Sequence, residues 1–208
     1  MSGVGSAMLL LASRSPRRAE LLRTLGVAFA VIDVEVDESP WSRESSAAYV
    51  RRLARMKAEA GRETAAVRSL PVLAADTTVV LDGAILGKPR DANDARAMLR
   101  RLGGRAHEVL TGVALIDRSG AIEDLVVVTR VAFRALEARS IDAYVASGEP
   151  ADKAGAYAIQ GLGGALVERI DGSYSNVVGL PLAETLALLD AAGVPHALSS
   201  SPSEMQGI

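Results

Sequence analysis

The chain has 208 residues, of which 49% are hydrophobic and 23% are charged, and its formal net charge is −2. These values are ordinary for a folded soluble domain, and the slight net acidity argues against a nucleic-acid-binding surface. The sequence contains no cysteine and two histidines, which excludes disulfides and thiolate metal sites and disfavours a histidine-ligated metal or a Ser-His-Asp triad. Any bound metal should therefore be a hard cation on carboxylate oxygens.

The sequence predicts neither a targeting segment at its start nor a membrane-spanning segment. Residues 1–8 lack the basic region and long apolar core of a signal peptide. No apolar run approaches the roughly 20 residues that cross a bilayer. The sequence therefore predicts a cytoplasmic protein that does not contact membranes. One domain is expected over residues 1–198, and a flexible tail over residues 199–208, where serine and proline recur.

The first informative stretch joins a short apolar strand at residues 8–12 to a helix that begins at Pro16. Ser15 precedes that proline and is expected to cap the helix. Arg17 and Arg18 then fall in the first turn, where the helix dipole disfavours each cation by roughly 0.3–1 kcal/mol. A bound phosphate would reverse this effect, because helix amides, hydroxyls and guanidinium groups all bind anions. An ordinary strand–helix unit with solvated arginines explains the local pattern equally well.

A second strand is predicted at residues 29–36, and acidic residues are dense within it and just after it. These acids could form surface salt bridges with the preceding arginines, and such pairs contribute little individually. They could instead supply a carboxylate for a metal beside a phosphate site. Glu38 is expected at the strand exit and is the preferred candidate for chemistry. The other acids are expected to be solvated: Asp33, Glu35 and Asp37.

A helix is predicted over residues 44–62, and Lys57 falls on its apolar face. The apolar positions that define this face are Val50, Leu53, Ala54 and Ala60. A lysine with a buried stem and a solvated ammonium group is common, and this is the preferred interpretation from the helix alone. The functional alternative directs Lys57 into a cleft between the helix and a sheet.

Asp76 interrupts the apolar pattern of the next stretch. The predicted elements there are strands at 72–75 and 79–81, a turn at Asp82-Gly83 and a short strand at 84–86. A buried, unpaired carboxylate is costly, so Asp76 should bind a metal, accept several hydrogen bonds or face a solvated cleft. A strand break or bulge is the structural alternative, but catalysis is preferred. Lys88 follows in a rigid Gly-Lys-Pro segment and either points back at the same cleft or is a plain turn lysine.

The remaining pattern predicts an α/β architecture with mixed strand directions. Asp91 is expected to cap a helix, and His107 at a strand start is expected to be structural rather than a base. The further predicted elements are a helix at 92–102, strands at 107–117 and 122–133, a helix at 138–146, a glycine-rich irregular segment at 153–164, a strand at 165–170, a loop at 172–178 and a last helix opened by Leu180-Pro181.

Taken together, these segments resemble the Maf family of nucleotide pyrophosphatases over about residues 9–192. The motifs that carry the resemblance are Leu11-Ala12-Ser13, Ser15-Pro16-Arg17-Arg18, Glu20-Leu21-Leu22, Ala75-Asp76-Thr77, Gly87-Lys88-Pro89-Arg90, Ile159-Gln160-Gly161 and the run SYSNVVGLP at 173–181. Several motifs in this order are specific. The resemblance implies an elongated α/β fold related to inosine triphosphatase, with a central mixed β-sheet flanked by helices and a cleft between two lobes.

The resemblance also implies hydrolysis of a nucleoside triphosphate to the monophosphate and pyrophosphate, with Mg²⁺ or Mn²⁺ and in a homodimer. It makes Asp76 the catalytic proton acceptor and places the metal on Asp76 and Glu38. Phosphate binding falls on four residues: Ser13, Arg18, Lys57 and Lys88. Substrate specificity falls on Arg17, Thr77 and Gln160, a set that looks like the dTTP/UTP pyrophosphatases rather than the 7-methyl-GTP subfamily.

The chemistry of these side chains agrees with that reaction. A carboxylate such as Asp76 can activate water at the α-phosphorus, while cations neutralise the leaving pyrophosphate. Gln160 offers a donor and an acceptor, which suits a pyrimidine edge. Two alternatives stay open: a pyrophosphatase for other modified nucleotides such as 7-methyl-GTP, and a non-catalytic nucleotide-binding regulator of cell division. A nucleic-acid-binding module is disfavoured because aromatic residues make up only 3% of the chain.

Overall fold

The computed structural model describes residues 7–63 and 69–199, and its strands form one seven-stranded sheet of order β2-β1-β3-β5-β6-β7, with β4 paired to β3. The strands are β1 (Leu9–Ala12), β2 (Phe29–Ile32), β3 (Val72–Leu81), β4 (Ala84–Leu86), β5 (Ala106–Ile116), β6 (Ile122–Phe133) and β7 (Val167–Asp171). β1 pairs in parallel with β2 and β3, and the other pairs are antiparallel. The predicted α/β class and mixed sheet are confirmed. Most of the predicted tail, residues 200–208, lies outside the described residues.

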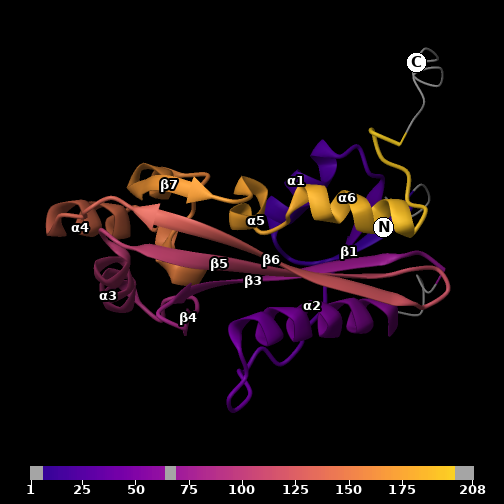
Figure 1. Ribbon diagram of the computed structural model, residues 1–208, viewed down its shortest axis with the longest axis horizontal. Helices are drawn as coiled ribbons and strands as arrows, with labels where there is room; N and C mark the ends of the chain where they lie inside the picture. The colour runs from indigo at the N-terminus through magenta and orange to yellow at the C-terminus, as the bar shows by residue number, and fades with distance from the viewer. Residues whose placement is uncertain (1–6, 64–68, 200–208) are drawn as a thin grey trace.

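Helices cover both faces of this sheet (Figure 1). They are α1 (Pro16–Thr24), α2 (Ser46–Glu63), α3 (Ala92–Leu102), α4 (Ala138–Ala146), α5 (Tyr174–Val178) and α6 (Leu182–Ala191). α2 lies along one face, α1 and α6 lie on the other, and α3 and α4 gather at one end of the long strands β3, β5 and β6. Among the helices in the described part of the chain, none is both long and apolar enough to cross a bilayer.

The β1 strand shows why the sheet needs helices on both sides. Leu9 and Leu11 pack with α1 and α6, whereas Leu10 and Ala12 pack with α2, and all four are fully buried. A strand buried on both faces reads as an uninterrupted apolar run, as this one does. Another core, around Phe133, joins the far ends of β3, β5 and β6 to α3 and α4. The sheet thus has one lobe around β1 and another around Phe133.

The β3 strand differs from its prediction because it runs unbroken through Asp76. β5 pairs with it along nearly its whole length, including Asp76 opposite Gly112, so the backbone hydrogen bonds continue where the apolar pattern stops. The predicted turn at Asp82-Gly83 is confirmed, with φ of 53° and 76° at the two residues.

Three other predicted segments need correction. β2 ends at Ile32 rather than at residue 36, and the acids that follow are exposed. The buried face of α2 continues through Ala58 and Gly61 instead of Ala60, because these positions follow Ala54 at helical spacing. The predicted loop at 172–178 contains the short helix α5, whose start is capped by the Ser173 side chain.

Candidate active site

A cleft of about 1040 Å³ opens beside the carboxyl end of β1, between the two lobes. Ligands of open α/β sheets often bind outside such strand ends. All nine residues that the sequence predicts for the site line this cleft: Ser13, Arg17, Arg18, Glu38, Lys57, Asp76, Thr77, Lys88 and Gln160. Ser13 and Asp76 are buried, whereas Lys88 and Gln160 are exposed. The structure thus brings together residues from both lobes.

The cleft lies along a gap in the strand pairing at one edge of β3. β1 covers this edge as far as Leu73, and β4 joins it again at Val79. Between these points, no strand in the described part of the chain pairs with the edge, and the exposed stretch contains Asp76 and Thr77. Successive strand side chains point to opposite faces, so Asp76 faces α2 and Thr77 faces α1. Both faces of the strand therefore contribute to one cleft.

Lys57 joins two of the acidic residues that line the cleft, Asp76 and Glu38. Its ammonium nitrogen lies 2.7 Å from Asp76 Oδ1 and 2.6 Å from Glu38 Oε1. The side chains of Lys57 and Asp76 are only 13% and 11% exposed. Lys57 does not extend into solvent, so the interpretation drawn from its helix alone is wrong. It is directed into the cleft, which is the functional alternative for this lysine, and there it contacts two carboxylates. The phosphate binding that the resemblance implies for Lys57 stays a prediction.

Close packing of α2 against β5 makes this contact possible. Gly112 lies opposite Asp76 in the sheet, and a Cβ atom there would lie 2.3 Å from the Val50 carbonyl oxygen. Only glycine allows the backbone of α2 to approach so closely. Lys57, two turns further along α2, then reaches Asp76.

Glu38 lies in an irregular segment, six residues beyond the end of β2, rather than at a strand exit. The Tyr49 hydroxyl donates to the Glu38 carbonyl oxygen at 3.0 Å and fixes this segment to α2. Burial raises the pKa of the Glu38 carboxyl, but the hydrogen bond and charge of Lys57, with Lys88 and Arg18, outweigh it and lower the pKa overall. Burial, together with the Asp76 and Glu38 charges, raises the pKa of Tyr49 to about 12. Glu38 is therefore ionised and Tyr49 neutral at pH 7.

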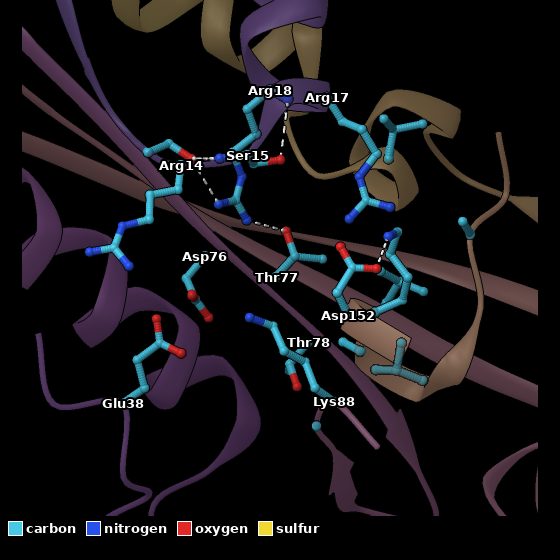
Figure 2. A pocket seen from close by; sticks show the side chains of 18 of the residues that line it. Arg14, Ser15, Arg17, Arg18, Glu38, Asp76, Thr77, Thr78, Lys88 and Asp152 are labelled. Atoms are coloured by element: carbon cyan, nitrogen blue, oxygen red, sulfur yellow. Dashed lines mark hydrogen bonds and ion pairs between the residues drawn. The ribbon is translucent and has the colours of Figure 1, made fainter. Parts of the chain in front are cut away.

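The start of α1 forms the cationic side of the cleft. Ser15 caps the helix through a long contact of 3.5 Å from the Arg18 amide, and Pro16 is its first residue, as predicted. The Arg18 guanidinium donates to the Gly179 carbonyl at 2.8 Å, to Thr77 Oγ1 at 3.1 Å and to Ser13 Oγ at 3.3 Å. Burial lowers the pKa of Arg18, and the Asp76 carboxylate opposes this shift. Figure 2 shows the Lys88 ammonium extending toward Asp76 from the other side of the cleft.

A divalent metal fits the donor set of the cleft. Asp76 and Glu38 offer carboxylate oxygens, the ligands that Mg²⁺ and Mn²⁺ prefer. No group of three or more acidic or histidine side chains that could hold a metal occurs within residues 7–63 and 69–199. Mg²⁺ usually takes one or two carboxylates and completes its shell with substrate phosphates and water, so two carboxylates suffice.

Two further charged residues line the cleft that the sequence did not single out. Asp152 and Lys153 form an ion pair. Figure 2 shows Asp152 on the side of the cleft where Arg17 lies. The signal available in the sequence was their position at the entry to the glycine-rich segment. Arg14, at the cleft rim, pairs with Asp33 and Glu35, so the salt-bridge interpretation holds for those two acids.

His107 is buried, and its Nε2 lies 2.9 Å from the Tyr157 hydroxyl. Burial lowers its pKa to about 4, so the ring is neutral at pH 7. Edge-on contacts with Phe133 and Tyr157 complete its surroundings. This environment agrees with the structural role expected of it.

Comparison with known proteins places these features in a family. The family model described as "Maf-like protein" matches residues 8–192. A dTTP/UTP pyrophosphatase of Myxococcus xanthus (strain DK1622) is 58% identical over 190 residues, which cover 90% of this chain and 94% of that protein. A dTTP/UTP pyrophosphatase of Methylobacillus flagellatus is 53% identical over 191 residues, covering 92% and 96%. Among solved structures, a HAM1 protein from Coxiella burnetii matches 89% of this chain and 100% of its own length with a TM-score of 0.51 at 17% identity, a likeness of fold.

Proposed function

This chain belongs to the Maf-like family, and from that premise we propose that it hydrolyses dTTP and UTP to the nucleoside monophosphate and pyrophosphate. The observation that carries the proposal is the position of Asp76. Its carboxylate is ion-paired to Lys57 in the same cleft where the neighbouring residue, Thr77, contacts the Arg18 guanidinium. A carboxylate beside an anion-binding helix start is the arrangement that hydrolysis of a phosphoanhydride requires.

Asp76 is the group that takes a proton from water as the water attacks the α-phosphorus. The Lys57 hydrogen bond to Oδ1 holds the carboxylate in a fixed orientation and leaves Oδ2 for the water. General-base catalysis of this kind contributes about 10²–10⁴-fold to a rate.

The cations opposite Asp76 bind the triphosphate and stabilise the leaving pyrophosphate. Arg18 and Lys88 bring positive charge to the cleft, and the helix dipole at the start of α1 adds to it. Ser13 and Thr77 hold the guanidinium of Arg18 in place. Preorganised donors of this kind stabilise developing negative charge without reorganisation during the reaction.

Asp76 and Glu38 are the residues that would hold the metal. When bound, Mg²⁺ or Mn²⁺ neutralises phosphate charge and makes the α-phosphorus more electrophilic. Lys57 keeps the two carboxylates side by side, which prepares them for a shared cation.

Arg17, Thr77 and Gln160 line the same cleft, and we assign them to recognition of the nucleoside rather than to bond breaking. This set and the names of the relatives favour pyrimidine nucleotides. The homodimer and the cytoplasmic location remain predictions from the sequence.

A nucleotide panel with Mg²⁺ or Mn²⁺ tests the proposed function. The expected result is pyrophosphate release from dTTP and UTP, faster than from 7-methyl-GTP, dCTP or GTP, with no release of single phosphates. In ¹⁸O-labelled water the label should enter the monophosphate, because water attacks the α-phosphorus. Label in pyrophosphate would contradict the mechanism, and nucleotide binding without any turnover would indicate the regulator instead.

A further inference from the structure

Thr111 is a fully buried polar residue that contacts the site through the cleft residue Thr77. It lies on β5 directly opposite Thr77 of β3, and its exposed fraction is 0%. Its hydroxyl oxygen lies 2.9 Å from Thr77 Oγ1 and 3.0 Å from the carbonyl oxygen of Asn176. Thr111 therefore links the cleft residue Thr77 to the backbone of α5.

The Asn176 carbonyl is a fixed end point for this chain of hydroxyl groups. The Asn176 side chain is buried and donates to the Val109 carbonyl at 3.0 Å and to Thr129 Oγ1 at 2.9 Å. The Ser173 hydroxyl accepts from the Asn176 amide at 3.2 Å. These contacts hold α5 against β5 and β6, so its carbonyl oxygen presents one lone pair to Thr111.

The direction of the hydrogen bonds follows from the chemistry of the groups. A carbonyl oxygen can only accept, so Thr111 must donate its single hydroxyl proton to Asn176. Thr111 can then only accept from Thr77, which uses the single proton of Thr77. Arg18 Nη2 donates to Thr77 Oγ1 and occupies one of its two lone pairs. Among the described contacts, one lone pair of Thr77 remains for a ligand.

We propose that Thr111 is a specificity-determining positioning residue, which fixes Thr77 as a hydrogen-bond acceptor toward the bound nucleoside. Thr77 is the one half-buried residue in the otherwise buried β3, and it lines the cleft. The proposal rests on the proposed function and adds a reason for its selectivity. A substrate must present a donor to Thr77, and a substrate that presents a lone pair is repelled.

The nucleoside of dTTP offers two donors that could meet this acceptor, the imide N3–H of the base and the 3′-hydroxyl of the sugar. Cytosine has an unprotonated N3, so dCTP lacks the first donor but keeps the second. The 3′-deoxy analogue of dTTP lacks the second donor but keeps the first. These two analogues therefore distinguish the sources.

The experiment compares wild type, Thr111→Val and Thr111→Ser on dTTP, dCTP and 3′-deoxy-dTTP. Valine keeps the shape but removes the acceptor of the Thr77 proton, so that Thr77 becomes free to donate into the cleft. In Thr111→Val, we expect the ratio of kcat/KM for dTTP to kcat/KM for one of the two analogues to fall about tenfold. A tenfold change corresponds to the free energy of one neutral hydrogen bond. Thr111→Ser, which keeps the hydroxyl, should retain the wild-type preference. Thermal unfolding checks that both variants fold.

A loss of rate by the same factor on all three substrates would mean that Thr111 only supports the fold, and this result would overturn the proposal. Unchanged preferences in a folded Thr111→Val variant would overturn it equally. The wild-type rate on dTTP tests the proposed function separately, because a wild-type protein without turnover contradicts that function whatever the variants do.

Discussion

Lys57 Nζ lies within hydrogen-bonding distance of both Asp76 Oδ1 and Glu38 Oε1, at 2.7 and 2.6 Å. One ammonium group thus balances the only two acids that we assign to the reaction. The relation explains how a carboxylate is tolerated inside an apolar strand, and it makes Lys57 central to both stability and activity.

Replacing Lys57 with Met should leave two carboxylates close together without a counter-charge. Removing one partner of a buried ion pair costs about 3–5 kcal/mol, and we expect the lower end because Glu38 is half exposed. Urea denaturation at pH 7 measures this loss. Arg14→Met is the matched control, because Arg14 also pairs with two acids but is 60% exposed, so its replacement should cost far less stability. Equal losses in the two variants would contradict the role of Lys57.

His107 predicts a specific pH dependence of stability. Its folded pKa of about 4 lies below the ordinary value of 6.5, so the unfolded chain binds more protons between these pH values. Stability should therefore fall as the pH falls from 6.5 to 4, by about 2 kcal/mol between pH 7 and pH 5 from this group alone. His107→Gln should remove this part of the loss. Denaturation curves at the two pH values test it, and an identical loss in the variant would show that other groups titrate.

Gly112→Ala should separate α2 from β5, since the new Cβ would lie 2.3 Å from the Val50 carbonyl oxygen. Overpacking of this kind costs about 1–3 kcal/mol, and the displaced helix should carry Lys57 away from Asp76 and lower kcat. Gly87→Ala serves as the stability control, because a Cβ there meets no described atom within 4 Å. Thermal unfolding and steady-state kinetics measure the two effects. A Gly112→Ala variant with wild-type stability would contradict the close packing.

Gln160→Leu should change the choice of nucleotide more than the rate. Gln160 is an exposed residue of the cleft lining, and its amide is the group we assign to the base. We expect the preference for dTTP over GTP to fall about tenfold, as the loss of one hydrogen bond allows. An unchanged preference with a large loss of kcat would place Gln160 in the reaction instead.

Local chemistry made part of this structure predictable. Ser15, Pro16 and the Asp82-Gly83 turn act on their immediate neighbours, so the helix start and the hairpin could be placed from the sequence. The apolar run at 9–12 predicted a buried strand for the same reason. The motif resemblance then predicted which residues form the site and that a cleft holds it.

The remaining features depend on contacts between distant segments. β3 runs unbroken through Asp76 because β5 pairs with it, and no local pattern contains that pairing. The direction of Lys57 is set by Asp76, whereas its place on the apolar face of a helix indicated only a buried stem with a solvated ammonium group. The sequence did not predict a role for Thr111, which is a polar residue in an apolar strand. Its role depends on Asn176, which lies 65 residues further along the chain.

The most direct test of the account is turnover and binding of dTTP by Asp76→Asn. Asparagine keeps the size of the side chain but cannot accept the proton of the attacking water. We expect pyrophosphate release to fall by about 10²–10⁴-fold, while calorimetry still detects dTTP binding through Arg18 and Lys88. An Asp76→Asn variant that releases pyrophosphate at the wild-type rate would contradict the account.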